Sequence, residues 1–341
     1  MKLSLSKLGV LSDRDLDWIN ATGITKSIAK GEILIRQTQP IDELYILLAG
    51  TLTVFVSSSE QENNRSEREI ATIASGEIVG EISFVDNQRA LTTIKATEKA
   101  NLLILSFQQL ENKIQQDEGF AARFYQTISA QLSHKLRRVS ALLVKNKVIS
   151  EPPLRKVLFV FAILDDSDID WMIESGMQVN ASAGKILIQQ GEPVEAVYIL
   201  IDGTLAVSVT LGEGNSRVTK DINQLSSGEI VGEMSFVETG KASATVASFE
   251  ESLLLAIPQQ QLAAKLKQDM QFAARFYRAI AVVLADRLRG GLIRHGYAQN
   301  TDLDGDIEYE GELDLDMLQQ TALAGTRFNW MARRVSGNNY Y

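Results

Sequence analysis

The sequence predicts an α+β protein made of two tandem antiparallel β-rolls, jelly-roll-like, each with helices before it and a long helix after it. Three observations predict this architecture: an internal repeat, short β-rich segments in the first half of each copy, and a helical periodicity in the second half. A chain of 341 residues has room for two domains of ordinary size. We expect domains at residues 1–150 and 151–298, followed by an acidic tail at 299–341.

The repeat is visible in two pairs of identical hexapeptides. GEIVGE occurs at 76–81 and 228–233, and FAARFY occurs at 120–125 and 272–277. Both pairs have the same offset of 152 residues (228 − 76). Upstream of Gly203 the offset is 153, so the second copy has one residue fewer in a loop, where length changes are tolerated.

Each copy begins with short segments rich in β-branched and aromatic residues, separated by turn residues. In the first copy these segments are 33–38, 43–48, 51–56, 68–74, 92–97 and 101–106. Many short strands with regular turns are typical of an antiparallel sandwich or roll.

The second half of each copy changes to a helical period. Apolar residues recur every three or four positions between 119 and 147, at Phe124, Ile128, Leu132, Leu136, Val139 and Leu143. The last four form a seam with the spacing of a helix-pairing surface. It predicts a homodimer or higher oligomer, or packing of this helix on the second copy. The equivalent helix of the second copy is expected to break at Gly290-Gly291.

Several segments resemble the signature of cyclic-nucleotide-binding domains, the family that includes the catabolite activator protein and the regulatory subunits of cyclic-AMP-dependent kinase. GEIVGEISF (76–84) and GEIVGEMSF (228–236) resemble the start of its phosphate-binding cassette, and TTIKA (92–96) and SATVAS (243–248) resemble its end. The run from Ile188 to Glu192 resembles the β-roll signature. The resemblance covers residues 10–148 and 163–298 and implies that each roll binds a cyclic nucleotide, cAMP or cGMP.

The cassette has a physical logic of its own, because a glycine opens a short helix whose free N–H groups bind an anion. The resemblance implies that Glu81 and Glu233 hold the ribose hydroxyl. The candidate ligand-binding residues are Gly80, Glu81, Ile82, Ser83, Arg89 and Thr92 in the first copy, and Gly232, Glu233, Met234, Ser235, Lys241 and Ser243 in the second.

Both cassettes depart from the family pattern at the arginine that neutralises the cyclic phosphate. Its usual position is occupied by Ala90 and Ala242, and the basic residues stand one place earlier, at Arg89 and Lys241. Arg89 is the better phosphate partner, because lysine offers a point charge without a planar fork. Two interpretations stay open: at least one copy binds a nucleotide-like ligand, or both are ligand-silent scaffolds with glycines kept for their turns.

Composition excludes several functional classes. A net charge of −9 gives no generic attraction to nucleic acid or anionic membrane, and the acidic tail is too short for a winged helix that binds DNA. The chain has no cysteine, only two histidines and no catalytic or metal-ligating constellation. We therefore expect no enzyme activity, no metal and no cofactor. The start of the chain lacks an apolar signal core and no membrane span is expected, so a cytoplasmic protein is predicted.

The leading hypothesis is therefore a non-enzymatic regulatory protein of signal transduction. It binds cAMP, cGMP or a related anion and switches the interaction with a protein partner that the sequence does not identify. The alternative is a structural or adaptor protein whose β-rolls bind no ligand.

Two further segments carry expectations. Acidic residues occupy every even position of 302–316, a period of two that would give a strand one acidic and one apolar face. This segment is predicted to be either an acidic linker or a strand or docking segment that contacts a partner or the second β-roll, and 317–335 is predicted to form a terminal helix. The basic residues Lys135, Arg137 and Arg138 predict a solvated helix face, and so do Arg287, Arg289 and Arg294.

Overall fold

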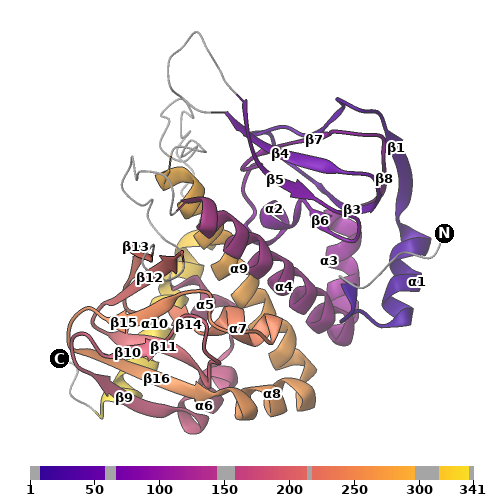
Figure 1. Ribbon diagram of the computed structural model, residues 1–341. Coiled ribbons are helices and arrows are strands. Elements are labelled where there is room, and N and C mark those ends of the chain that lie inside the picture. The colour runs from indigo at the N-terminus through magenta and orange to yellow at the C-terminus, as the bar shows by residue number, and fades with distance from the viewer. Residues whose placement is uncertain (1–7, 58–66, 144–157, 213–216, 296–314, 338–341) are drawn as a thin grey trace. The chain divides into compact units, whose positions relative to one another are not determined.

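A computed structural model describes most of the chain and divides it into two compact units (Figure 1). The first unit comprises residues 1–155 and 281–308, and the second comprises 156–280 and 309–341. The described residues are 8–57, 67–143, 158–212, 217–295 and 315–337.

The first unit is built on two four-stranded antiparallel sheets. Their strand orders are β1-β8-β3-β6 and β2-β7-β4-β5. The strands are β1 (Ile24–Ile28), β2 (Ile33–Ile35), β3 (Glu43–Ala49), β4 (Leu52–Ser57), β5 (Glu67–Ile73), β6 (Ile78–Val79), β7 (Thr93–Ala96) and β8 (Ala100–Ser106). Its helices are α1 (Asp13–Thr22), α2 (Glu81–Asp86), α3 (Phe107–Gln116) and α4 (Glu118–Leu143), together with residues 281–294 of α9.

The second unit repeats this topology. Its sheets have the orders β9-β16-β11-β14 and β10-β15-β12-β13, which match the first unit strand for strand. The strands are β9 (Met177–Ala181), β10 (Ile186–Ile188), β11 (Ala196–Asp202), β12 (Leu205–Leu211), β13 (Val218–Leu225), β14 (Ile230–Val231), β15 (Thr245–Ser248) and β16 (Ser252–Pro258). The helices are α5 (Phe159–Ile163), α6 (Asp166–Ser175), α7 (Glu233–Glu238), α8 (Gln259–Gln268), α9 (Met270–Arg294, up to 280) and α10 (Leu315–Ser336).

The two copies agree in register as well as in order. Tyr45 pairs with Val79, and Tyr198 pairs with Val231. The register of β3 against β8 shifts between Leu47 and Ala49, and the register of β11 against β16 shifts at the equivalent place. The predicted fold of two antiparallel β-rolls flanked by helices is confirmed.

The repeated FAARFY hexapeptide packs each long helix onto its own unit. Phe120 and Phe124 are almost fully buried in α4, with their rings 5.6 Å apart between centroids. Phe84 of α2 meets Phe124 edge-on at 5.8 Å, and Phe236 of α7 meets Phe276 of α9 in the same way at 6.2 Å. These aromatic contacts tie the short helix of each cassette to the long helix that follows it.

A buried ion pair ties α1 to α4. Arg123 donates from Nε to Oδ2 of Asp15 at 2.6 Å and from Nη2 to Oδ1 at 3.0 Å. Burial raises the pKa of Asp15, but hydrogen bonds from Arg123 and Ser12 outweigh it, so the pKa lies below its usual value.

The expected break in the second long helix is wrong. α9 runs through Gly290 and Gly291 to Arg294. Glycine costs roughly 1 kcal/mol in a helix interior, and tertiary packing overrides such propensities. Here Leu288 and Leu292, on either side of the glycines, are each only 3% exposed.

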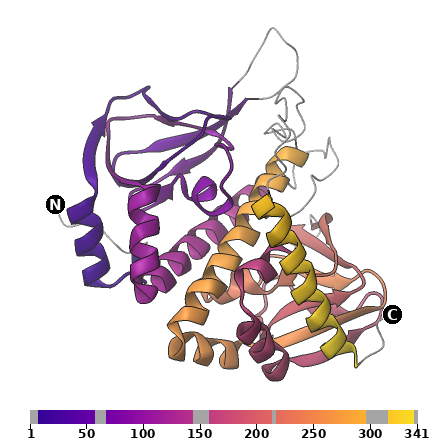
Figure 2. The same ribbon diagram turned by 180° about the vertical axis from the view of Figure 1, so that it is seen from behind.

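The predicted terminal helix is confirmed as α10, which packs against α5 and α6 of the same unit (Figure 2). Arg327 pairs with Asp166 and donates to the carbonyl oxygens of Phe161 and Leu164. Phe328 packs against the ring of Phe161 at 5.2 Å. Residues 302–314 lie outside the described residues, so the linker and docking interpretations of that segment stay predictions.

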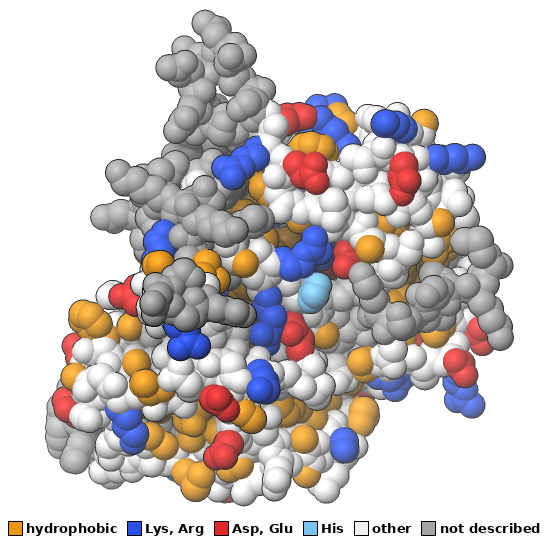
Figure 3. Space-filling model, in the orientation of Figure 1, with side chains coloured by type: hydrophobic (Ala, Val, Ile, Leu, Met, Phe, Trp, Pro, Cys, Tyr) orange, Lys and Arg blue, Asp and Glu red, His pale blue; other side chains and the backbone are white. Residues whose placement is uncertain are grey.

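The predicted pairing seam is buried in the single chain. Leu132, Leu136 and Val139 are 0%, 8% and 6% exposed, and the side chain of Leu143 lies outside the described part. The oligomeric state stays a prediction. None of the described helices is long and apolar enough to cross a bilayer. On the face shown in Figure 3, acidic and basic side chains are interspersed over the described surface.

Candidate functional site

The start of each cassette needs glycine for the backbone itself. Gly80, which precedes α2, has φ of 91°, and a Cβ there would lie 2.7 Å from the carbonyl oxygen of Glu43. Gly232 has φ of 89° and would meet the carbonyl oxygen of Ala196 at 2.6 Å. A side chain is excluded at both positions by conformation and by space. These glycines are therefore required by the fold, with or without a ligand.

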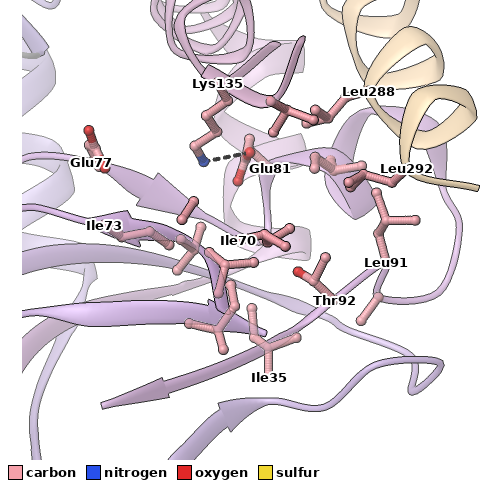
Figure 4. A pocket seen from close by; sticks show the side chains of 18 of the residues that line it. Ile35, Ile70, Ile73, Glu77, Glu81, Leu91, Thr92, Lys135, Leu288 and Leu292 are labelled. Carbon is pink, nitrogen blue, oxygen red and sulfur yellow. Dashed lines mark hydrogen bonds and ion pairs between the residues drawn. The ribbon is translucent and has the colours of Figure 1, made fainter. Parts of the chain in front are cut away.

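A cavity lies against the cassette of the first copy (Figure 4). The empty space within it is about 750 Å³, a figure that includes open solvent. Most of its lining residues are Ile, Leu, Val or Ala, and they come from the strands, the cassette, α4 and residues 281–294 of α9. Figure 4 shows Leu288 and Leu292 reaching in from α9 on the side where Leu91 lies.

The structure brings most of the predicted first-copy residues to this cavity and leaves one outside. The residues that line it are Gly80, Glu81, Ile82, Ser83 and Thr92. Arg89 is exposed and donates from Nη1 to the carbonyl oxygen of Thr38 at 3.3 Å. Ala90, at the position where the family has its arginine, is 5% exposed and lines the cavity.

Glu81 is held by a lysine that the sequence analysis assigned to a solvated helix face. Nζ of Lys135 on α4 lies 2.7 Å from Oε1 of Glu81, and the two side chains are 18% and 3% exposed. Figure 4 shows this pair at the wall of the cavity. The expectation for Lys135 is wrong, because its Nζ turns inward to neutralise a buried carboxylate.

α4 also holds the strand that enters the cassette. Gln131 accepts at Oε1 from the backbone N–H of Ile78 at 2.8 Å, and Nζ of Lys135 donates to the carbonyl oxygen of Ile78 at 2.7 Å. Arg138 donates to the carbonyl oxygen of Thr72 on β5 at 3.0 Å. The cassette and the neighbouring strand are therefore bonded directly to one helix.

The loop after α2 is held by α9. Nη2 of Arg289 lies 2.8 Å from Oδ2 of Asp86, and the two side chains are 12% and 5% exposed. The same guanidinium donates to the carbonyl oxygen of Arg89 at 3.3 Å. The prediction of a solvated helix face is therefore wrong for Arg289, because its guanidinium neutralises a buried carboxylate. The backbone that carries Arg89 and Ala90 is held by a helix that also lines the cavity.

The second cassette has the same backbone with different side-chain chemistry. Glu233 and Ser235 are 1% and 5% exposed. Oγ of Ser243 lies 3.8 Å from the sulfur of Met234, a weak hydrogen bond that joins the two ends of the cassette. Lys241 is exposed.

The sequence contained a signal for the residues it missed. Lys135 lies three positions after Leu132 and four before Val139, both buried, so it shares their helix face. The residue at the equivalent position of the second copy, Arg287, is also basic. A positive charge repeated on a buried helix face indicates a fixed acidic partner and not a solvated surface.

A model of the cyclic nucleotide-binding domain matches the chain twice, over residues 25–117 and 178–269. A mouse protein, patatin-like phospholipase domain-containing protein 6, is 21% identical over 292 residues. That match covers 85% of this chain but only 18% of the length of the mouse protein. A cAMP-dependent protein kinase regulatory subunit from Dictyostelium discoideum is 19% identical over 68% of this chain and 62% of its own length.

Two solved structures are also similar. One is the regulatory domain of Toxoplasma gondii PKA with cAMP, which is 16% identical, covers 77% of this chain and 93% of its own, and has a TM-score of 0.28. The other is the regulatory subunit of a cAMP-independent protein kinase A from Trypanosoma cruzi bound to guanosine. It is 16% identical over 78% of this chain and 81% of its own, with a TM-score of 0.29.

Proposed function

Because the chain belongs to the cyclic nucleotide-binding domain family, we propose that it is a non-enzymatic regulatory protein. In this proposal a small ligand enters the cavity of the first β-roll, and the helices that close the cavity respond by changing a surface that a protein partner recognises. In this proposal the protein is cytoplasmic. Residues 1–150 and 151–298 form the two cyclic-nucleotide-binding-like domains, and residues 299–341 form the acidic tail.

The observation that carries this proposal is the direct bonding of α4 to the cassette. Gln131 and Lys135 satisfy the backbone groups of Ile78, and Phe124 packs on Phe84 of the cassette helix. A ligand that moves Glu81 or α2 must therefore disturb contacts of α4. This coupling supports a sensor in which ligand binding at the cassette shifts the position of α4.

A cyclic nucleotide is the ligand that the family suggests, and the first cavity offers it some of the expected contacts. Gly80 and Ser83 line the wall, and Glu81, whose Oε1 accepts from Lys135, keeps acceptor capacity for a ribose hydroxyl. Arg89 points outward. We therefore expect cAMP and cGMP to bind at micromolar strength or weaker, since a charged hydrogen bond contributes about 1.5–3 kcal/mol.

The second candidate function is a structural or adaptor role with ligand-silent β-rolls. Ala90 and Ala242 at the arginine positions favour it, and Gly80 and Gly232 are compatible with it because the backbone conformation alone explains their presence. In this case the partner surface would be permanent and the oligomeric assembly of the chain would be its main property.

Hydrogen-exchange mass spectrometry on the full chain separates the two candidates. The sensor proposal expects slower exchange in α4 and in residues 281–294 when cAMP, cGMP, guanosine or an aliphatic carboxylate such as decanoate is added. The equivalent measurement at residues 177–181 of β9, remote in sequence from either cassette, is the internal control. Unchanged exchange with every probe at millimolar concentration would favour the scaffold.

A further inference from the structure

The lining of the first cavity is aliphatic. Its walls include Ile35, Ile70, Ile73, Leu91 and Leu292, and none of the described residues that line it is aromatic. A flat purine gains much of its binding from stacking on an aromatic ring, whereas a flexible hydrocarbon chain gains it from close contact with branched aliphatic side chains. The absence of aromatic side chains from the described lining therefore favours an aliphatic ligand over a purine.

The charged side chains that line the cavity balance one another, and two of them already form an ion pair. The charged residues that line the cavity are Glu77, Glu81, Lys135 and Arg138, two of each sign. Lys135 already neutralises Glu81 and donates to Ile78, so it has a single N–H left for the several oxygens of a phosphate. Ala90 adds a buried methyl group where a phosphate partner would be needed. A multiply charged or phosphate-centred ligand is disfavoured.

The two basic groups of the lining, Lys135 and Arg138, lie on one helix. Lys135 and Arg138 are three residues apart on α4, so their side chains leave the helix on one face. Of its three N–H bonds, the Lys135 ammonium uses two in the described contacts, to Glu81 and to Ile78. This end of the cavity can take one hydrogen-bond acceptor, such as a carboxylate or a hydroxyl.

The second copy is more polar at two of the apolar positions that line the first cavity. At the repeat offset of 152 residues, Ala71 corresponds to Asn223 and Leu91 corresponds to Ser243. Ser243 is hydrogen-bonded to Met234 across its cassette. Other lining positions stay aliphatic in the second copy, as Ile188, Val231 and Val246 show. The first cavity is therefore distinguished at Ala71 and Leu91 and not by its aliphatic lining as a whole.

We propose that the cavity of the first β-roll binds an aliphatic molecule with a single hydrogen-bond-accepting head group, with the chain among Ile35, Ile70, Leu91 and Leu292 and the head at Lys135. This rests on the proposed function, because it names the ligand class of the same regulatory site. Both a fatty carboxylate and a fatty alcohol carry such a hydrogen-bond-accepting head group, and the test distinguishes the two.

Calorimetry on the full chain tests the proposal with decanoate and 1-decanol, both below their aggregation limits, and with cAMP. We expect one site for decanoate or decanol and weaker binding of cAMP. Ile70→Asn should weaken the aliphatic ligand by about tenfold, the order expected from losing one branched side chain at the contact. Its matched control is Ile222→Asn on β13, the equivalent half-buried position of the second copy, which should leave binding unchanged.

The outcomes separate the ligand class from the function. Binding of cAMP alone would overturn the aliphatic class and leave the regulatory proposal standing. Binding of no probe to a folded chain would overturn both. Equal effects of Ile70→Asn and Ile222→Asn would overturn the assignment to the first cavity. Binding of decanoate without decanol would support the proposal with a carboxylate head, and binding of both would support it with a neutral acceptor.

Discussion

The two β-rolls have the same strand order, the same register and the same cassette glycines, yet the helices that follow the two cassettes differ in sequence at the positions that bond the first one. Gln131 and Lys135 of α4 bond to Ile78 and Glu81 in the first roll, and the equivalent positions in the second are Val283 and Arg287. The difference teaches that the β-roll needs its glycines and aromatic contacts, whereas the chemistry of the pocket can change between copies of one chain.

The largest effect is expected from breaking the Glu81–Lys135 ion pair, which is seen in the first β-roll. Lys135→Met leaves a carboxylate that is 2% exposed without its partner, and should lower the free energy of unfolding of the first unit by about 3 kcal/mol. Urea denaturation followed by Trp18 fluorescence measures this in a chain whose other two tryptophans, Trp171 and Trp330, are replaced by phenylalanine.

The double variant Glu81→Gln/Lys135→Met is the control for that experiment, because it removes the buried charge together with its partner. It should recover most of the lost stability. A loss below about 1 kcal/mol in the single variant would mean that solvent already stabilises Glu81, and the pair would then be no more than a surface contact.

The next effect concerns the position where both copies lack the family arginine. Ala90→Arg places a guanidinium on the cavity wall, and should raise the affinity for cAMP by about ten- to a hundredfold, as one charged hydrogen bond implies. Calorimetry with cAMP measures it. The same variant should weaken decanoate, because a charge enters an apolar lining.

Arg89→Ala is the matched control for Ala90→Arg. Arg89 is exposed and bonded to Thr38, so its removal should leave the affinity for cAMP within about twofold. A tenfold loss in Arg89→Ala would show instead that this side chain swings into the site, and the difference between the neighbouring positions would disappear.

A smaller effect is expected from a substitution in α10, the helix that packs against α5 and α6 in the second unit. Gly325 lies inside α10, and a Cβ there would have open space around it. Gly325→Ala should therefore stabilise the second unit by about 0.8 kcal/mol, the difference in helix propensity. Thermal unfolding measures it, and a destabilised variant would contradict the placement of this helix.

The smallest effect is a pH dependence in the first unit. Because the pKa of Asp15 is lowered in the folded state, its ion pair with Arg123 stabilises the unit fully above about pH 4. That contribution is lost as the pH falls through the lowered pKa. Asp15→Asn should reduce the acid sensitivity of unfolding and leave the slope between pH 5 and pH 7 unchanged. An unaltered acid midpoint would contradict this role.

The repeat made the fold predictable, because glycines, aromatic residues and strand spacing are local patterns that recur at one offset. In the first copy the six predicted strands agree with the structure to within a few residues, whereas β1 and β6 were not predicted. Gly80, Glu81, Ile82, Ser83 and Thr92 line one cavity, and their role in binding a ligand stays a prediction. The roles of side chains were harder to predict, because they depend on contacts between segments far apart in sequence.

Two particular residues show the limit. Lys135 reads as a surface lysine until its helix face is known to be buried, and Arg89 reads as a phosphate partner until its backbone is seen to be fixed by Arg289. The continuous helix through Gly290 and Gly291 shows the same limit, since the packing of Leu288 and Leu292 outweighs local propensity.

The central claim is that the first β-roll, and not the second, holds an aliphatic ligand. Methyl NMR of a chain labelled at isoleucine tests it most directly during a titration with decanoate. The account predicts shifts at the cavity residues Ile35, Ile70 and Ile73, with the second-copy residues Ile188 and Ile222 unmoved. Shifts confined to the second copy, or equal shifts in both, would contradict it.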